Sequence, residues 1–275
     1  MSEYGNLEIY GVGKQRGGRF GRVLIAGSGK ITGNVECDRF ELPGAGKIEE
    51  GSLLVHGPME IDGACKVEGC AEAETLEVNG SLKTAGPSRV AGNLEVNGSM
   101  KTENASLAVG GRADICGSLK TEGDFSAEML DVTGAVHVEG SLKTTEAVVD
   151  GVLKVEGEVQ AERFRAEGVV KIDGLLNAET VELGLAGEDE IASIGGGSVR
   201  VYRSRRGFGL FNKRPHLLAE LIEADEISLE YTDVETVRGV NVHIGPECVV
   251  DRVEYSGTLT TDASASIGTR VKLNL

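Results

Sequence analysis

The sequence predicts an all-β protein folded as a parallel β-helix, in which short strands stack coil upon coil. Three observations support this prediction. A glycine-led pentapeptide recurs through the middle of the chain, apolar and polar residues alternate between the glycines, and the 275 residues include 40 glycines but no tryptophan. Glycine opposes helix formation, and a short repeat is typical of a stacked, quasi-one-dimensional architecture.

The pentapeptide Gly-Ser-Leu-Lys-Thr indicates the length of one coil. A coil of about 17–19 residues holds two or three short strands, which leaves no room for hairpins, so each strand must pair in parallel with its equivalent one coil later. The wider interval between Gly117 and Gly140 predicts a loop that protrudes near residues 123–130. The copies, one with Met for Leu and the last two looser, lie at residues 80–84, 98–102, 117–121, 140–144, 157–161 and 174–178.

Alternation between the glycines predicts which side chains face inward. Leu94 and Val96 flank Glu95, which is the pattern of a strand with one buried face. An antiparallel sandwich of hairpins is the alternative fold, but its loops would not normally repeat one pentapeptide. The same parity predicts an outward lysine ladder, which we interpret as a solvated face rather than a partner-binding stripe. The ladder consists of Lys83, Lys101, Lys120 and Lys143.

Four regions are expected along the chain. Residues 1–22 form a Gly- and Arg-rich N-terminal arm without clean alternation, and residues 23–186 form regular β-helix coils. Residues 187–216 combine a Gly-rich break with a basic and aromatic loop, and residues 217–275 form a second, less regular set of coils. The predicted architecture is therefore a single solenoid with an interruption near 187–216.

Composition argues against several classes of function. A formal net charge of −16 is unfavourable for non-specific nucleic-acid binding. No apolar run approaches the roughly 18 residues of a transmembrane helix, and residues 1–20 lack the apolar segment of a secretory signal. Five scattered cysteines without a CxxC motif predict a reduced, cytoplasmic protein. By parity, Cys37 and Cys65 are expected to face inward and Cys116 outward.

No motif indicates catalysis, so we expect neither an enzyme nor a metal or cofactor. The four histidines share no spacing, with each other or with carboxylates, that indicates a metal site or a catalytic triad. Residues 27–32 resemble the end of a phosphate-binding loop, but Leu24 stands where that motif has its first glycine, and Ile31 where it has Ser or Thr. Left-handed β-helix acyltransferases are the enzymatic alternative. Their hexapeptide pattern is found only at Ile244 and Ile267, each followed by glycine.

A basic segment is the clearest departure from the repeat. Residues 195–219 contain no carboxylate, and six cations alternate there with aromatic residues. Such a segment can dock on the acidic surface of another subunit, on a polyanion or on a membrane headgroup layer. We predict a partner or membrane contact, with a solvated loop as the alternative. The predicted contact residues are Arg200, Arg203, Arg205, Arg206, Phe208, Phe211, Lys213 and Arg214.

The two ends of the predicted solenoid are expected to promote association. The outermost strands expose unpaired backbone N–H and C=O groups, which can pair with another chain. Natural solenoids prevent this with polar caps, and no long amphipathic helix in the sequence could cap either end. End-to-end contacts between copies would generate a filament.

The glycine-punctuated repeats resemble those of bactofilins, the polymer-forming cytoskeletal proteins of bacteria. Residues 151–157 and 168–174 carry the resemblance most clearly, and similar repeats extend over residues 23–185. The stretches 222–227 and 237–239 resemble longer relatives in Gram-positive bacteria. The chain departs from typical members, which have one compact β-helix between disordered, often Pro-rich tails.

The resemblance implies a right-handed β-helix, nucleotide-independent assembly into filaments or sheets, and a scaffold role at the cell envelope. We therefore expect a cytoplasmic structural protein, near the inner face of the cell membrane, that binds itself and other proteins. We expect no nucleic acid and no small-molecule substrate. The alternative is a non-polymerising β-helix binding module that holds a specific protein or anionic partner through the basic segment.

Overall fold

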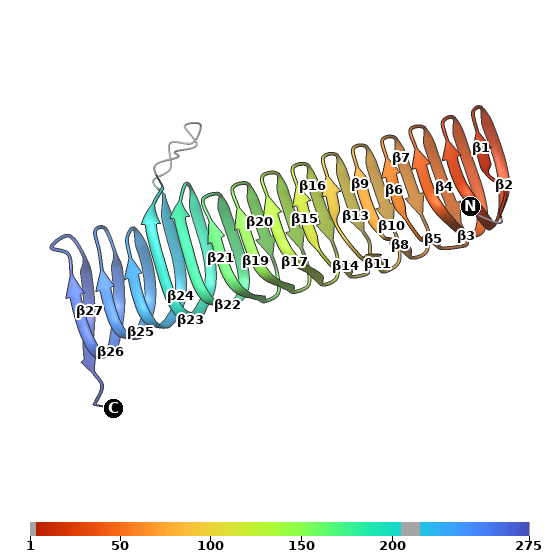
Figure 1. Cartoon of the computed structure of the whole chain (residues 1–275). Helices are drawn as coiled ribbons and strands as arrows, with labels where there is room; N and C mark the ends of the chain where they lie inside the picture. The colour runs from red at the N-terminus through yellow and green to blue at the C-terminus, as the bar shows by residue number, and fades with distance from the viewer. Residues whose placement is uncertain (1–3, 205–214, 275) are drawn as a thin grey trace. The chain divides into compact units, whose positions relative to one another are not determined.

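The chain is all-β. The structure, a computed structural model, describes residues 4–204 and 215–274, and every regular element in these two ranges is a β-strand (Figure 1). The strands pair in parallel with the equivalent strand of the next coil, so the predicted parallel β-helix is confirmed. The chain divides into two compact units, residues 1–140 (unit 1) and 141–275 (unit 2).

Unit 1 contains strands β1 to β18, most of them three to five residues long. They are β1 (Leu7–Ile9), β2 (Val12–Ile25), β3 (Ser28–Leu42), β4 (Ala45–Glu49), β5 (Leu53–Val55), β6 (Pro58–Ile61), β7 (Ala64–Val67), β8 (Ala71–Ala73), β9 (Thr75–Val78), β10 (Ser81–Thr84), β11 (Ser88–Val90), β12 (Leu94–Val96), β13 (Ser99–Thr102), β14 (Leu107–Val109), β15 (Arg112–Ile115), β16 (Ser118–Thr121), β17 (Phe125–Val132) and β18 (Ala135–Val138).

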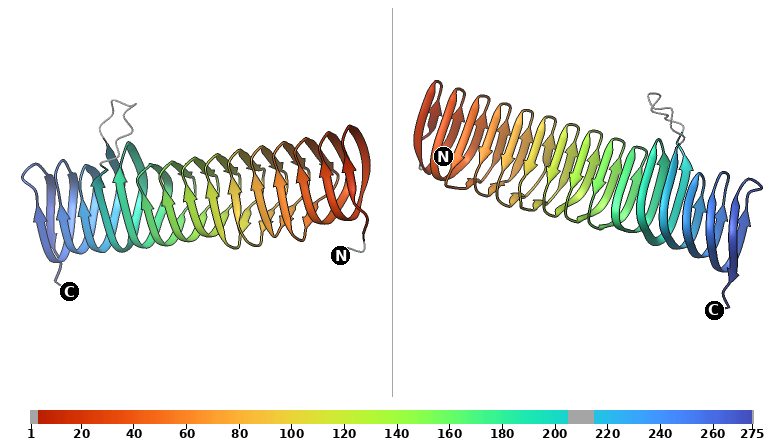
Figure 2. Two further views of the ribbon diagram at one scale, coloured as in Figure 1. Left: turned by 45° about the horizontal axis from the view of Figure 1, so that its top comes forward. Right: turned by 180° about the vertical axis from the view of Figure 1, so that it is seen from behind.

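These strands form three parallel ladders, and the ribbon views show them stacked coil upon coil (Figures 1 and 2). The lysine face comprises residues 12–16, residues 28–32, β4, β7, β10, β13, β16 and β18. The acidic face comprises β1, residues 22–25, residues 40–42, β6, β9, β12, β15 and residues 129–132. The third face comprises residues 18–20, residues 35–37, β5, β8, β11, β14 and residues 125–126.

The predicted N-terminal arm is wrong, because residues 7–22 already form a coil. Both β1 and β2 pair with the coil that follows. The alternation is hard to see in the sequence because some inward positions of this first coil lack large apolar side chains. Gln15 lies opposite the buried Ile31, and Gly18 stands at another inward position.

The pentapeptide at residues 140–144 is out of phase with the earlier copies. Gly134, not Gly140, occupies the corner that corresponds to Gly117, as the alignment of β16 with β18 shows. The fourth copy therefore starts from a different corner of the coil. The predicted loop near residues 123–130 is wrong for the same reason, since β17 runs through this region as a continuous strand.

Unit 2 contains longer strands that bend through the corners of the coil. They are β19 (Leu142–Val149), β20 (Val152–Val155), β21 (Val159–Ala166), β22 (Val169–Leu185), β23 (Glu188–Arg203), β24 (His216–Leu229), β25 (Thr232–Ile244), β26 (Val249–Thr261) and β27 (Ser266–Lys272).

The predicted interruption over residues 187–216 is wrong for its Gly-rich first half, because β23 spans Glu188–Arg203. β23 is continuous and pairs with β22 on one side and β24 on the other. Its glycines reflect close packing of the coils, because a Cβ on Gly196 would overlap the carbonyl oxygen of Ala178. The predicted boundary between residues 186 and 187 does not separate compact units. The boundary between the two units follows Gly140.

The core is made of stacked aliphatic side chains, as the alternation predicts. Cys37 and Cys65 lie on the inward side, where burial raises the pKa of each thiol to about 12. Cys116 faces outward, also as predicted. The interior also accommodates aromatic rings: Phe40 and Phe125 are completely buried.

Leu142 tests the inward parity of unit 2. Its side chain is buried, so Leu142→Asp should place an unpaired carboxylate in an apolar column and destabilise the unit by about 3–5 kcal/mol. The neighbouring Lys143 is exposed, so Lys143→Asp is the matched control. Thermal unfolding followed by circular dichroism should show a large loss of stability for Leu142→Asp and little change in stability for Lys143→Asp. Similar melting curves for both would contradict the parity.

Asp189 is an inward-facing carboxylate that the alternation did not single out. It lies in the column that continues at Leu217, and Val170 N donates a hydrogen bond of 2.7 Å to its Oδ1. Burial raises the pKa of this carboxyl to about 7, because removal from water disfavours the charged form. Near neutral pH the fold therefore holds a group that resists ionisation.

The raised pKa of Asp189 predicts a pH-dependent stability. Folding favours the protonated acid, so this stabilisation is complete below about pH 4 and is lost as the pH rises through 7. Relative to the Asp189→Asn variant, the free energy of unfolding of the unmodified chain should fall by up to about 4 kcal/mol between those limits. Denaturant unfolding of both proteins at pH 4.5 and pH 8.5 measures the difference. A stability gap that is the same at both pH values would refute the assignment.

Candidate functional site

The structure describes only two of the predicted contact residues, Arg200 and Arg203. Both lie near the end of β23, and both are exposed. The Arg200 guanidinium lies 5.2 Å from the centre of the Tyr202 ring, and that of Arg203 lies 5.6 Å from the centre of the Tyr231 ring. Stacking on the rings keeps both cations on the outer surface. Outside the described residues lie Arg205, Arg206, Phe208, Phe211, Lys213 and Arg214.

The lysine ladder exists and is longer than predicted. Lys83, Lys101 and Lys120 lie opposite one another on successive coils of the lysine face. Lys143 is not part of it, because it pairs with Gln160, and His137 follows Lys120 in the column. The shifted phase of the fourth pentapeptide explains this error. Towards the N-terminus the ladder continues through Lys66, Lys47, Lys30 and Lys14.

A glutamate column beside the lysine ladder neutralises most of it. Lys101 Nζ lies 2.9 Å from a carboxylate oxygen of Glu103 and 2.9 Å from one of Glu122, so one lysine joins two coils. Lys83 and Lys101 together hold the pKa of Glu103 at about 2. These ion pairs support the interpretation of the ladder as a solvated face. The spacing Lys-x-Glu, visible at residues 101–103, is the sequence signal that could have predicted them.

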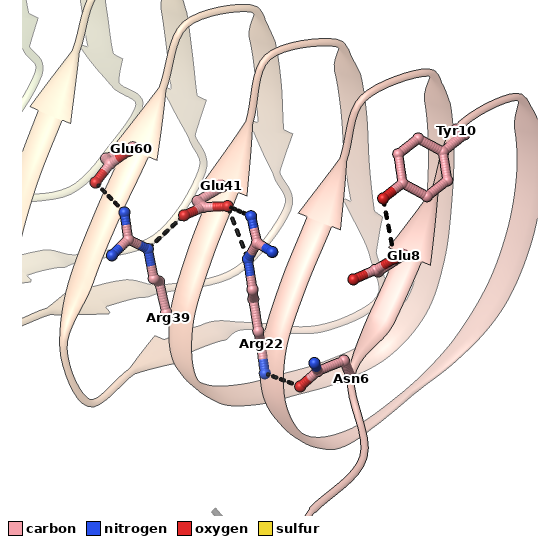
Figure 3. A network of polar contacts seen from close by, with 7 residues as sticks. All are labelled: Asn6, Glu8, Tyr10, Arg22, Arg39, Glu41 and Glu60. Atoms are coloured by element: carbon pink, nitrogen blue, oxygen red, sulfur yellow. Dashed lines mark hydrogen bonds and ion pairs between the residues drawn. The ribbon is translucent and has the colours of Figure 1, made fainter.

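The acidic face carries a second ladder, on which arginines join carboxylates of neighbouring coils. Arg39 Nη2 donates a 2.8 Å hydrogen bond to Glu60 and also pairs with Glu41, which in turn contacts Arg22 (Figure 3). Arg112 makes equivalent contacts further along the unit. The aligned carboxylates are Glu41, Glu60, Glu77, Glu95, Asp114 and Asp131.

The first coil of unit 1 presents an open strand edge. In the described part of the chain, residues 7–22 pair with the following coil and have no strand on their other side. The Asn6 side chain covers one backbone donor there, accepting a 3.1 Å hydrogen bond from Arg22 N (Figure 3). Two apolar side chains beside this edge are freely accessible: Val12 is 92% exposed and Tyr10 is 70% exposed. The last coil of unit 2 is similarly open, since β27 pairs with β26 alone among the described strands.

The histidines do not converge on a shared site. Three of the rings contact different neighbours: His56 lies 3.1 Å from Glu36, His243 lies 2.8 Å from Thr260, and His216 lies 2.9 Å from Asp233. Within residues 4–204 and 215–274, no group of three or more His, Cys, Asp or Glu side chains could hold a metal ion. In the same ranges, no helix is long and apolar enough to cross a membrane.

Two curated proteins of Bacillus subtilis (strain 168) are similar to parts of the chain. Uncharacterized protein YhbE is 55% identical over 60 residues, which is 22% of this chain and 25% of that protein. Uncharacterized protein YhbF is 34% identical over 94 residues, or 34% of this chain and 39% of that protein. The chain thus spans well under half the length of the curated relatives it matches. No model of a known protein family matches the chain, and no solved structure matches it.

Proposed function

We propose that this chain is a structural protein of the bactofilin type, which self-assembles end to end without a nucleotide and scaffolds envelope-associated proteins in the cytoplasm. The proposal includes no catalysis, cofactor, nucleic acid or small-molecule substrate. The observation that carries it is the open edge of the first coil. There, a strand edge that pairs with no other described strand lies beside the exposed side chains of Val12 and Tyr10.

An unpaired parallel edge favours pairing with another strand, because its backbone groups lose nothing by exchanging water for a strand partner. Burial of the two apolar side chains on contact would add a favourable term of about 25 cal/mol per Å². The last coil of unit 2 supplies the second open edge that end-to-end growth requires. The sequence resemblance to bactofilins supports the same role.

Charges placed at the first edge should block this assembly. In the variant Tyr10→Lys with Val12→Lys, pairing at the edge would bury ammonium groups, so assembly should need roughly tenfold more protein. Electron microscopy and sedimentation velocity measure the assembly. The matched control is Val152→Lys, since Val152 is also an exposed valine, 47% accessible, but lies within a paired strand of unit 2. Assembly that survives in the double variant, or that fails equally in the control, would contradict the proposal.

A second candidate function is a binding module that holds a protein or an anionic surface through the basic segment. Arg200 and Arg203 favour it, because ring stacking keeps both guanidinium groups on the outside. This candidate requires no polymer.

Removing the cations tests this candidate. The variant Arg203→Ser, Arg205→Ser and Arg206→Ser should keep its thermal stability within about 0.5 kcal/mol but lose partner or membrane association. Pull-downs from lysate and flotation with anionic liposomes measure the loss. If neither changes, the basic segment is not the contact.

A further inference from the structure

Unit 2 contains a groove of about 560 Å³ on its outer surface, formed by residues of β22 to β26. It combines carboxylates with accessible apolar side chains. Leu218 is 37% exposed and Val249 is 49% exposed, and the small side chains of Ala192 and Ala219 leave the surface hollow between them. The carboxylates that line it are Asp173, Glu190, Glu220, Asp233, Glu235 and Asp251.

The groove lies where a column of lysines is followed by acidic and apolar residues. Lys154 and Lys171 lie opposite each other, but the next residue in this column is Glu190. Leu218, Asp233 and Val249 then follow on successive coils. Repeated lysines therefore give way to acidic and apolar residues in one stretch of the same surface.

The groove's carboxylates differ from those of the ladders in unit 1, most of which are neutralised by lysine or arginine. Among the described residues, Lys171 forms an ion pair with Glu190 alone, at 3.3 Å. Asp173, Glu220 and Glu235 make no ion pair in the part of the chain that the structure describes. The groove thus concentrates uncompensated negative charge around accessible apolar side chains, which suits a cationic segment that also carries apolar groups.

The same chain contains a segment of that chemistry. Residues 205–214, which lie outside the described residues, read Arg-Arg-Gly-Phe-Gly-Leu-Phe-Asn-Lys-Arg. Four cations and no carboxylate match the acidic lining, and two phenylalanines and a leucine match its apolar part. A described residue that follows the segment lies close to the groove. The segment leads through Pro215 into His216, whose Nε2 lies 2.9 Å from a carboxylate oxygen of Asp233.

We propose that the groove binds the basic segment 205–214 of a second copy of this chain. Because the segment joins the fold beside the groove, two copies that face each other can exchange segments reciprocally, as a two-fold symmetric contact requires. The proposal rests on the proposed self-assembly but uses the side of unit 2 rather than the terminal edges. It therefore adds a lateral contact to the end-to-end one.

Charge reversal on the two sides tests the contact. The groove variant carries Glu220→Lys and Glu235→Lys, and the segment variant carries Arg205→Glu and Arg206→Glu. All proteins are full-length and also carry Tyr10→Lys and Val12→Lys, so that end-to-end contacts do not obscure the lateral one. Sedimentation equilibrium should show a dimer for the otherwise unmodified chain, and dissociation constants raised at least about tenfold for each variant alone.

Mixing distinguishes a contact between copies from one within a copy. The groove variant and the segment variant repel their own kind, but each offers the other a complementary groove and segment. Their equimolar mixture should therefore form heterodimers with nearly the original dissociation constant. A single chain with all four reversals should recover dimerisation too. The matched control is Glu77→Lys with Glu95→Lys, two exposed carboxylates of the acidic face in unit 1, which should leave the constant unchanged.

Several outcomes would overturn the proposal. A monomer at every concentration excludes the lateral contact, and so does a control that weakens dimerisation as much as the groove variant does. If dimerisation recovers in the chain with all four reversals but not in the equimolar mixture, the segment binds the groove of its own chain. End-to-end assembly is judged separately, in chains with unmodified Tyr10 and Val12. The two proposals can thus fail independently.

Discussion

Backbone hydrogen bonding between equivalent residues of successive coils is the interaction on which both units depend. Each strand is too short to be stable alone, and it lies in register with a near copy of itself on either side, as β13 does between β10 and β16. Many corners allow this because glycine occupies them. A Cβ on Gly117 would overlap the carbonyl oxygen of Gly98, one coil earlier. Glycine is required here for close approach rather than for an unusual backbone angle.

In-register stacking has a direct electrostatic consequence. Any charged residue in the repeat is placed near its own copies, about 5 Å away on each side, which is unfavourable unless opposite charges lie between them. Unit 1 meets this constraint with two interleaved columns, so that Lys101 contacts Glu103 on its own coil and Glu122 on the next. The acidic face achieves the same with Arg39 and Arg112, each of which contacts carboxylates on two coils. Most of the charge on these faces is therefore internally compensated.

The surfaces that we propose as contacts are those where this charge compensation or strand pairing stops. Within the described residues, the first coil has an edge with no strand beside it, and Asp173, Glu220 and Glu235 of the groove form no ion pair. Inside the core, Asp189 places a carboxyl at an inward position, and burial raises its pKa to about 7. The end-to-end and lateral contacts that we propose use the first two of these features, the edge of the first coil and the groove of unit 2.

The sequence by itself determined the architecture, because local alternation and glycine spacing are enough to specify short strands that can pair only between coils. It also placed Cys37 inside, Cys116 outside and Lys83 in an outward ladder with Lys101 and Lys120. Only the tertiary structure decided the phase of each coil. The same pentapeptide can occupy more than one corner of a coil, so the sequence could not show that Lys143 lies outside the lysine ladder. Glycine at inward positions interrupts the apolar alternation of the first coil, so that coil could not be recognised from the sequence. The groove of unit 2 could not be predicted either, because its carboxylates come from five strands that only the stacking of coils brings together.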